Sequence, residues 1–357
     1  ARLIGAKNPL IVAGNEIVTS DALAEAGQLA SILGAPAYQQ TVAYNVQFLS
    51  EHPAYLGALS REQASIRKTL DPHDVLLFVG ADVLRTSVAS DVVPMPPGAS
   101  VIQIGLRDWE AGKNYPAEIA LHADVRETLR ALIPVLEQKG GTALKTTAAN
   151  RLAELQDKNW SARHPKARER ALSLSGAVPI APEWLTVNIV DALPEDSIIV
   201  NEALTSMRAL SGLRPNRHRY DYHANASGGI GWGLPGAIGI QLAHPNRPVV
   251  CLSGDGSALY SIQALWTAAH LDLPITFIIT NNKSYRILKQ RLRAFHGSDT
   301  DVGMDFLKPE IDFAGIARSF GVTAERITDP DAVRPALDAA MARRGPTLLD
   351  VIVDGTV

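Results

Sequence analysis

The chain has 357 residues, a length for which two domains are the usual expectation. Hydrophobic residues at 46% and charged residues at 20% are typical of a globular protein. The formal net charge of -3 argues against nucleic acid and against anionic membranes as partners. The longest apolar runs have the length of a strand and are too short to span a bilayer. With one cysteine, Cys251, and no signal-like segment after Ala1, we predict a cytoplasmic location.

Residues 1–138 alternate short apolar strands with helical stretches. We predict strands at 10–13, 75–80 and 101–105, and helices at 20–33 and 124–136, with Ser20 and Asp21 as capping candidates for the first helix. Alternation of this kind predicts an α/β domain with a doubly wound parallel sheet. Residues 139–178 are polar and charged, and we interpret them as an interdomain linker with a solvated helix.

Residues 179–357 form a second alternating unit, which predicts a second doubly wound parallel sheet. The expected strands are 197–200, 249–253, 275–280 and 347–353. The expected helices are 182–193, 231–243, 261–271, 313–320 and 331–342.

Polar residues follow two consecutive strands of this second domain, at the point where each strand ends. Gly254-Asp255-Gly256-Ser257 follows one strand, and Asn281-Asn282 follows the next, after one helix. Because ligands of open parallel sheets collect outside the carboxyl ends of the strands, we expect Asp255 and Asn282 to be neighbours. Either motif alone is a common turn, whereas the two at matching strand ends predict a binding site.

The residue types at this edge predict magnesium and a diphosphate. Gly254 and Gly256 let the backbone approach a phosphate, and the helix that follows would present amide groups to it. The Asp255 carboxylate and the Asn282 side-chain oxygen are hard ligands of the kind that Mg²⁺ prefers, with phosphate oxygens and water completing its octahedron. The backbone carbonyl of Ser284 would complete the protein's share.

These motifs resemble those of the thiamine diphosphate-dependent pyruvate oxidase and decarboxylase superfamily, and the finer likeness is to the benzoylformate decarboxylase family. The resemblance covers the whole chain but only the last two thirds of a family chain. It implies that residues 1–138 are a Rossmann-like middle domain and that 179–357 bind the diphosphate. The supporting stretches are Gly228-Gly229-Ile230-Gly231 with Leu234-Pro235, Tyr260-Ser261-Ile262, and Ala264-Leu265-Trp266-Thr267-Ala268-Ala269.

The resemblance also implies residue roles. Magnesium would be held by Asp255, Asn282 and the Ser284 carbonyl, and the diphosphate would be surrounded by Thr205, Gly254, Gly256, Ser257 and Tyr285. Ile230 would hold the cofactor in its bent form, and the Gly228 carbonyl would accept a hydrogen bond from the aminopyrimidine. The bend places the amino group beside the acidic carbon of the thiazolium, where it can remove the proton.

Two residue types bear on the substrate. His52, in Ser50-Glu51-His52-Pro53, resembles a catalytic histidine of the family's middle domain, although a histidine before proline in a loop is usually an ordinary surface residue. Arg291 stands where the family places small or aromatic pocket residues, which puts an aromatic substrate in doubt. A solvated helix face for Lys289, Arg291 and Arg293 is favoured over a phosphate clamp.

The activity implied is the magnesium-dependent, non-oxidative decarboxylation of a small 2-keto acid. In the family, the glutamate that activates the cofactor lies on a separate pyrimidine-binding domain, which nothing in this chain matches. We therefore expect a companion chain or a fragment to supply that domain, and a homodimer or a dimer of dimers as the assembly. The alternatives within the enzyme class are an acetolactate synthase-like carboligase and a 2-hydroxyacyl-coenzyme A lyase.

Two further classes remain open. A non-catalytic thiamine diphosphate-binding subunit is compatible with the missing glutamate. A Rossmann-type oxidoreductase using residues 1–138 would need a Gly-x-Gly-x-x-Gly turn after a strand, and neither Gly80-Ala81-Asp82 nor Gly105-Leu106-Arg107-Asp108 supplies one.

Overall fold

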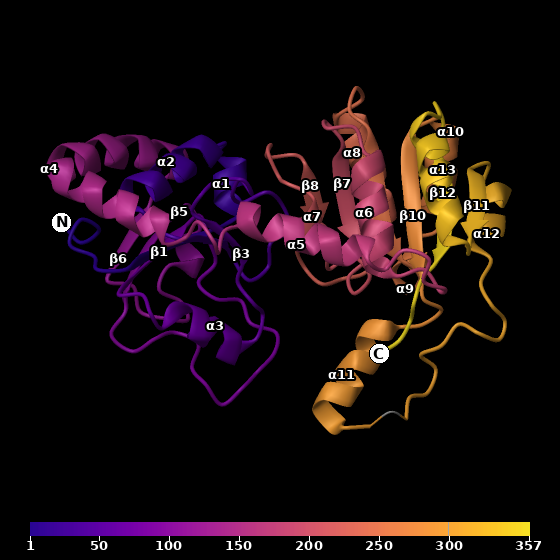
Figure 1. Ribbon diagram of the computed structural model, residues 1–357, viewed down its shortest axis with the longest axis horizontal. Coiled ribbons are helices and arrows are strands. Elements are labelled where there is room, and N and C mark those ends of the chain that lie inside the picture. The colour runs from indigo at the N-terminus through magenta and orange to yellow at the C-terminus, as the bar shows by residue number, and fades with distance from the viewer. Residues whose placement is uncertain (299) are drawn as a thin grey trace. The chain divides into compact units, whose positions relative to one another are not determined.

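The computed structural model describes residues 1–298 and 300–357. The chain divides into two compact units, one of Ala1–Pro165 with Pro215–Tyr220 and one of Lys166–Arg214 with Asp221–Val357 (Figure 1). Each unit is built on a six-stranded sheet with parallel strand pairs. The predicted α/β class with two doubly wound sheets is confirmed. Within the described ranges, no helix combines the length and the apolar character needed to cross a bilayer.

The sheet of the first unit has the strand order β3-β2-β1-β4-β5-β6. From β1 the chain winds to one side through β2 and β3 and then crosses to β4 on the other side, which is the pattern of a doubly wound sheet. The strands are β1 Pro9–Ala13, β2 Ala37–Gln39, β3 Tyr55–Ala58, β4 Val75–Val79, β5 Ser100–Gly105 and β6 Ile119–His122.

Two apolar layers cover this sheet, because successive side chains of a strand point to opposite faces. Ile11 and Leu77 belong to the layer that contains α2 and α4, whereas Leu10 and Phe78 pack with α3 on the other face. The helices of this part of the chain are α1 Asn15–Thr19, α2 Leu23–Leu33, α3 Gln63–Leu70, the 3-10 turn η1 Asp108–Glu110 and α4 Val125–Ala153.

The sheet of the second unit has the strand order β11-β12-β10-β9-β7-β8, so β9 and β10 are central and β11 is an edge strand. The strands are β7 Ile198–Glu202, β8 Tyr222–Ala224, β9 Val249–Gly254, β10 Ile275–Asn281, β11 Thr323–Ile327 and β12 Thr347–Ile352.

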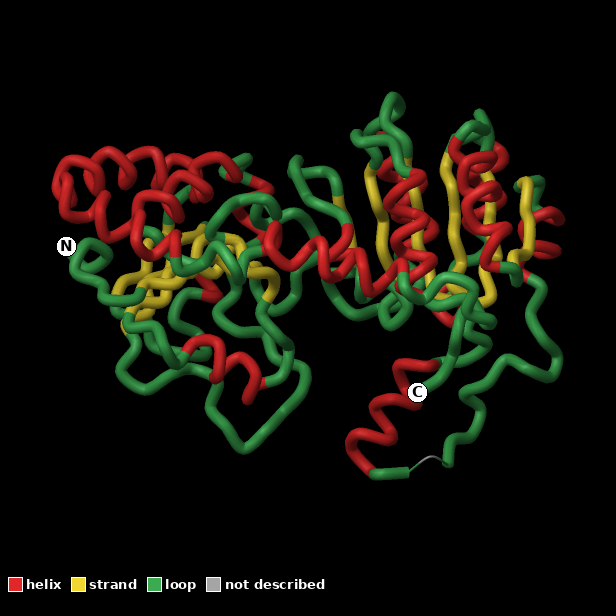
Figure 2. Tube along the Cα trace, viewed as in Figure 1, coloured by secondary structure: helices red, strands yellow, loops and turns green. Residues whose placement is uncertain are grey.

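Helices line both faces of this second sheet, and Figure 2 shows several of them running alongside the strands. Val250 and Leu252 of β9 pack against the layer of α6 and α13, while Val249 and Cys251 belong to the layer of α8, α10 and α12. The strands are therefore apolar on both sides, as in other parallel sheets. The remaining helices are α5 Trp160–Leu172, α6 Pro182–Ala192, α7 Leu210–Leu213, α8 Gly233–Ala243, α9 Asp255–Ala258, α10 Ala264–His270, α11 Arg286–His296, α12 Phe313–Ser319 and α13 Pro330–Met341.

The start of α2 differs from the prediction. The structure has an additional short helix, α1, and Ser20 is its C-cap. The N-cap of α2 is Ala22, with no side-chain hydrogen bond, so the predicted capping by Ser20 or Asp21 is wrong. Asp21 instead has a left-handed backbone, with a φ of 56°, in the turn between the two helices.

Helix α4 begins as predicted and ends later. The Asp124 carboxylate caps it by accepting a hydrogen bond from the Glu127 N–H at 3.0 Å. The helix continues to Ala153 through a kink at Gly141, where φ is 53°. Leu144, beyond the kink, is buried, so this stretch is not uniformly solvated. The predicted boundaries at 138 and 178 stay predictions.

Candidate cofactor site

The carboxyl ends of three adjacent strands of the second sheet lie at one edge. β9 runs between β7 and β10, with Glu202 level with Ser253 and Thr280 level with Gly254. From β7 the chain turns outward to β8, whereas β9 and β10 lie on the other side of β7. This edge is therefore a topological switch point, where open sheets bind ligands.

Asp255 and Asn282 converge on one backbone amide at this edge. The Ser284 N–H donates to Asp255 Oδ2 at 3.2 Å and to Asn282 Oδ1 at 3.1 Å. The Ser284 hydroxyl donates to the same Asn282 oxygen at 3.0 Å. The structure thus brings together the three residues predicted to hold magnesium, with the two side-chain oxygens directed to a common point.

The Asp255 carboxylate is a buried charge, since the residue is only 2% exposed. Burial raises the pKa of Asp255 to about 6, and the groups that act to lower it are backbone N–H groups. A buried charge is costly unless a partner compensates it. The described residues contain no group of three His, Cys, Asp or Glu side chains suited to a metal. A carboxylate and an amide oxygen nevertheless fit Mg²⁺, which takes its other ligands from phosphate and water.

Lys283 shapes the loop between β10 and α11. Its φ of 60° is left-handed, which is uncommon for a residue other than glycine. Asn281 Oδ1 accepts a hydrogen bond from the Lys283 N–H at 3.1 Å, which closes an Asx turn. This reversal directs the Ser284 N–H back toward Asn282 and Asp255. Asn281 has no role in the prediction from sequence, although it is the first member of the Asn-Asn pair.

Gly256 lies against the ring of Tyr285. A Cβ at Gly256 would lie 2.5 Å from Tyr285 Cε1, so the position requires glycine. The Gly256 N–H donates to the Asp255 carboxylate at 2.8 Å, and the helix that begins here, α9, is a single turn. The Gly256 N–H, which the sequence predicts to face a phosphate, is thus already hydrogen-bonded to the Asp255 carboxylate. Gly254 is half-buried, and Ser257 is buried at this turn.

Glu202 holds the loop that leads into α8. Its carboxylate, 1% exposed, accepts hydrogen bonds from the N–H groups of Gly231 at 2.9 Å, Trp232 at 3.1 Å and Gly233 at 2.8 Å. These amides have no partner within the helix, and an anion at a helix start stabilises them. Glu202 has no role in the prediction from sequence, and its only signal there is an acidic residue at the end of an apolar strand.

Gly228 and Ile230 lie in the loop that Glu202 holds. Asn225 Oδ1 accepts a hydrogen bond from the Gly228 N–H at 3.0 Å, and the Asn225 amide donates to the Gly229 carbonyl. Gly228 is exposed and Ile230 half-buried. Among the described residues no hydrogen bond reaches the Gly228 carbonyl, which leaves it available to a ligand. Thr205 is half-buried in the turn after β7.

His52 belongs to the first unit, and both of its ring nitrogens are used there. Nδ1 accepts a hydrogen bond from the Ala54 N–H at 3.1 Å, so Nε2 carries the proton and donates it to Ser31 Oγ at 3.0 Å. The ring meets Phe48 edge-on at 5.3 Å, and burial lowers the pKa of His52. The catalytic role of His52 stays a prediction.

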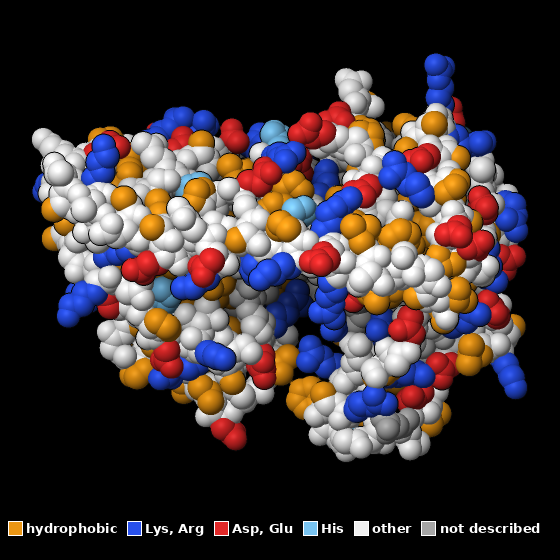
Figure 3. Space-filling model, viewed as in Figure 1, with side chains coloured by type: hydrophobic (Ala, Val, Ile, Leu, Met, Phe, Trp, Pro, Cys, Tyr) orange, Lys and Arg blue, Asp and Glu red, His pale blue; other side chains and the backbone are white. Residues whose placement is uncertain are grey.

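The basic residues after the metal loop lie on α11. Lys289 pairs with Asp305 at 2.6 Å, Arg293 donates to the Val357 carbonyl at 2.6 Å, and Arg291 is exposed. Basic and acidic side chains are interspersed on the face that Figure 3 shows. Arg291 and Arg293 are exposed as expected for a solvated helix face, whereas the side chain of Lys289 is only 18% exposed and pairs with Asp301 and Asp305.

Two family models match the chain. The model described as the central domain of thiamine pyrophosphate enzymes matches residues 1–132, and the C-terminal TPP binding domain matches residues 204–351. The benzoylformate decarboxylase of Pseudomonas aeruginosa is 34% identical over 351 residues, which are 98% of this chain and 62% of that protein. An acetolactate synthase large subunit of Parasynechococcus marenigrum is 29% identical over 359 residues, covering 98% of this chain and 54% of that protein.

A solved structure agrees with these relatives. The thiamine diphosphate-dependent 4-hydroxybenzoylformate decarboxylase of Rhodococcus jostii matches with a TM-score of 0.83 and 31% identity, covering 99% of this chain and 62% of that one. The fold and the site thus define an α/β protein with a candidate ligand-binding edge on its second sheet. The chain belongs to the thiamine pyrophosphate (thiamine diphosphate) enzyme family, of which it carries the central and the C-terminal TPP-binding domains. It spans 62% of the length of the P. aeruginosa relative.

Proposed function

We propose that Asp255, Asn282 and the Ser284 carbonyl bind the magnesium ion of a magnesium–thiamine diphosphate complex. The observation that carries the proposal is the convergence of the Asp255 and Asn282 oxygens on the Ser284 N–H, at a topological switch point. The raised pKa of Asp255 supports it, because a buried carboxylate without a cationic partner gains most from a bound cation.

The diphosphate and the rings of the cofactor are assigned to the neighbouring strand ends. Thr205, Gly254, Gly256, Ser257 and Tyr285 are proposed to surround the diphosphate, at the ends of β7, β9 and β10. Ile230 is proposed to support the bend of the cofactor, and the Gly228 carbonyl to accept a hydrogen bond from the aminopyrimidine. The loop that Glu202 and Asn225 hold would keep these two groups in place.

The proposed reaction is the non-oxidative decarboxylation of a 2-keto acid. Bound thiamine diphosphate supplies a nucleophilic carbon for the keto group and accepts the electron pair released with carbon dioxide. The likeness to benzoylformate decarboxylases supports this reaction. If His52 transfers a proton in it, its Nε2 must first exchange the Ser31 hydroxyl for the substrate.

The proposed activity also requires a pyrimidine-binding domain, on the same polypeptide or on a companion chain. This chain matches 62% of the P. aeruginosa relative and 62% of the R. jostii structure. The unmatched remainder of these proteins is compatible with a further domain that contributes to the activity. Its glutamate would activate the cofactor. The homodimer or dimer of dimers and the cytoplasmic location stay predictions.

An acetolactate synthase-like carboligase is the second candidate. The likeness to acetolactate synthase large subunits favours it, and the proposed cofactor site would serve both reactions. The two reactions differ in the electrophile that enters after carbon dioxide has left. The 2-hydroxyacyl-coenzyme A lyase and the non-catalytic subunit remain as possible outcomes of the test.

Calorimetric titration of the intact protein with thiamine diphosphate and Mg²⁺ tests the cofactor assignment. We expect saturable, magnesium-dependent binding that Asp255→Ala abolishes and that Asp338→Ala, a change at an exposed position on α13, leaves intact. Binding that is indifferent to Asp255→Ala would refute the site.

A substrate panel then separates the candidate reactions. The panel contains benzoylformate, pyruvate, longer 2-keto acids and a 2-hydroxyacyl-coenzyme A, each assayed with and without a pyrimidine-binding companion. Carbon dioxide with an aldehyde product supports the decarboxylase, and an acetohydroxy acid product supports the carboligase. Cleavage of the coenzyme A substrate supports the lyase. Cofactor binding without turnover of any substrate supports the non-catalytic subunit.

A further inference from the structure

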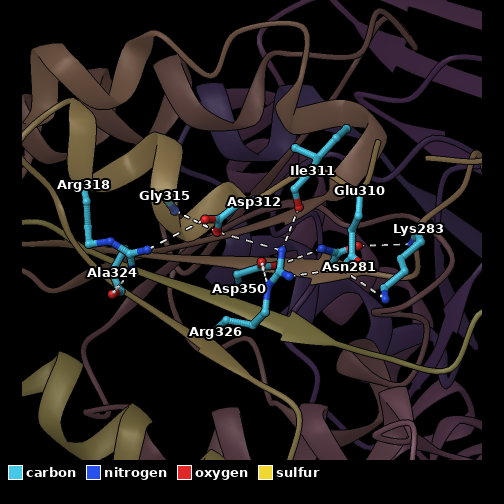
Figure 4. A network of polar contacts seen from close by, with 10 residues as sticks. All are labelled: Asn281, Lys283, Glu310, Ile311, Asp312, Gly315, Arg318, Ala324, Arg326 and Asp350. Atoms are coloured by element: carbon cyan, nitrogen blue, oxygen red, sulfur yellow. Dashed lines mark hydrogen bonds and ion pairs between the residues drawn. The ribbon is translucent and has the colours of Figure 1, made fainter. Parts of the chain in front are cut away.

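Five residues form a closed ring of polar contacts behind the metal loop, with one contact made by the backbone N–H of Lys283 (Figure 4). Asp350 Oδ1 accepts a hydrogen bond from Asn281 Nδ2 at 2.9 Å, and its Oδ2 accepts one from Arg326 Nε at 2.8 Å. Arg326 Nη1 and Lys283 Nζ both reach Glu310 Oε1, at 3.0 and 3.1 Å. The Lys283 N–H donates to Asn281 Oδ1 at 3.1 Å, which closes the ring.

The ring is anchored in the sheet. Asp350 lies in β12, level with Arg326 of β11, and it is 0% exposed. Both of its oxygens are satisfied, one by a guanidinium and one by an amide, as a buried carboxylate requires. Asn281, the last residue of β10, is 2% exposed. The loop that follows Asn281 therefore starts from a fixed point.

Lys283 is where the ring meets the candidate cofactor site. Its left-handed backbone is held by Asn281 at the N–H and by Glu310 at the ammonium group. The turn at Lys283 sets the directions of its two neighbours, Asn282 and Ser284, and the Ser284 N–H donates to both the Asn282 and the Asp255 side-chain oxygens. A change in the ring would thus reach the proposed metal ligands without any direct contact to them.

We propose that Asn281, Asp350 and Arg326 are positioning residues that fix the Lys283 turn and thereby set the affinity of the loop for magnesium. The inference rests on the proposed function, because it takes the metal to bind at Asp255 and Asn282. Residues that orient metal ligands from behind typically contribute about 10- to 100-fold to metal affinity. The ring would act in this way through backbone geometry.

The test compares variants of the ring with a matched control from the same polar region. Asn281→Ala removes both hydrogen bonds of the Asn281 side chain, and Asp350→Asn removes the charge between Asn281 and Arg326. Arg318→Gln is the control: its guanidinium donates to the Ala324 carbonyl at 3.1 Å, outside the ring. The readouts are the Mg²⁺ dissociation constant of the intact protein at saturating thiamine diphosphate, by calorimetric titration, and the thermal midpoint of the metal-free protein.

We expect Asn281→Ala and Asp350→Asn to raise the Mg²⁺ dissociation constant about 10- to 100-fold. Arg318→Gln should leave it unchanged. If Asp350→Asn fails to fold, Asn281→Ala carries the test, because Asp350 loses one hydrogen bond but keeps its ion pair with Arg326. A folded Asn281→Ala protein with wild-type affinity overturns the proposal, whereas a wild-type protein that binds no magnesium overturns the proposed function itself.

A rescue variant separates positioning from general weakening of the fold. Glycine adopts left-handed backbone without the penalty of a side chain. Lys283→Gly in the Asn281→Ala background should therefore recover part of the lost magnesium affinity, although it adds no contact and removes the ion pair with Glu310. If the double variant binds magnesium no better than Asn281→Ala does, the Lys283 turn is not the link between the ring and the metal.

Discussion

Asp255 and Asn282 share a single hydrogen-bond donor, the backbone N–H of Ser284. Each side chain also accepts a second hydrogen bond, Asp255 from the Gly256 N–H and Asn282 from the Ser284 hydroxyl. The groups that lower the pKa of the almost fully buried Asp255 are backbone N–H groups, which carry no net charge, so a cation would supply the charge compensation that they do not.

Magnesium and thiamine diphosphate should stabilise the folded protein. At a free ligand concentration about 100 times the dissociation constant, the gain in the free energy of unfolding is about 2.7 kcal/mol. Thermal unfolding with and without the two ligands measures it, and a chelator should reverse the shift. Asp255→Ala should show no shift, and Asp338→Ala should keep the full one. An equal ligand-induced shift of thermal unfolding in both variants would show that the metal binds at another site.

Glu202→Gln should destabilise the second unit. The substitution keeps the size of the side chain but places an amide NH₂ against backbone N–H groups that now meet a carboxylate. Because hydrogen bonds to a charged acceptor contribute about 1.5–3 kcal/mol each, we expect a loss of about 2 kcal/mol in urea unfolding. Glu325→Gln, at an exposed position of β11, should change stability by less than about 0.5 kcal/mol. Equal effects of the two variants would contradict the role of Glu202.

Gly256→Ala should displace the Tyr285 ring, because the added methyl group has no room beside Cε1. Overpacking of this kind typically costs about 1–3 kcal/mol. In a Tyr285→Ala background the same change should cost much less, since the ring is gone. A double-mutant cycle of unfolding free energies measures this coupling. Strict additivity would show that another contact demands glycine at this position.

Acid should destabilise the first unit through His52. Burial lowers the pKa of His52 in the folded state below its ordinary value of 6.5, so the unfolded state binds more protons as the pH falls through 6.5. The stability that neutral His52 contributes is present above pH 6.5 and is lost below it. His73 and His223 shift in the same direction, while the raised pKa of Asp255 acts in the opposite direction near pH 6.

The measurement is therefore a difference between proteins. Between about pH 7.5 and about pH 5.5, His52→Gln should lose less thermal stability than the wild type, because glutamine does not titrate. His122→Gln, at an exposed histidine on β6, is the control and should follow the wild type. Parallel curves for all three proteins would show that His52 titrates alike in the folded and unfolded states.

The main strands and the convergence of Asp255 with Asn282 follow from the sequence. Both residues end apolar strands that one crossover separates, and parallel-sheet topology brings such ends together. The predicted capping of α2 by Ser20 or Asp21 is wrong because Ser20 is the C-cap of the short helix α1. Strands such as β2 and β8 have only three residues each, too few for a periodic signal.

The residues that support the site could not be predicted in the same way. Asn281 and Asp350 are hydrogen-bonded between two neighbouring strands, β10 and β12. These strands are far apart in the chain, so no local sequence motif indicates the pair. Glu202 accepts hydrogen bonds from the amides at the start of α8, and in the chain the strand β8 lies between these two segments. Asn225 has a clearer local signal, since asparagine close to a Gly-Gly pair is typical of a side-chain-closed turn.

The position of β11 at the sheet margin has a consequence for how the cofactor would be lost. In the described part of the chain, β11 pairs with β12 alone, and two of its five residues, Thr323 and Glu325, are exposed. Strands of this kind fray at free energies below that of global unfolding. Because Arg326 is carried by β11, fraying would withdraw the guanidinium from Asp350 while the strands from β12 to β8 are still paired. On warming, the amide hydrogens of β11 should therefore exchange with solvent ahead of those of β9, and the metal should dissociate from a molecule that is otherwise still native.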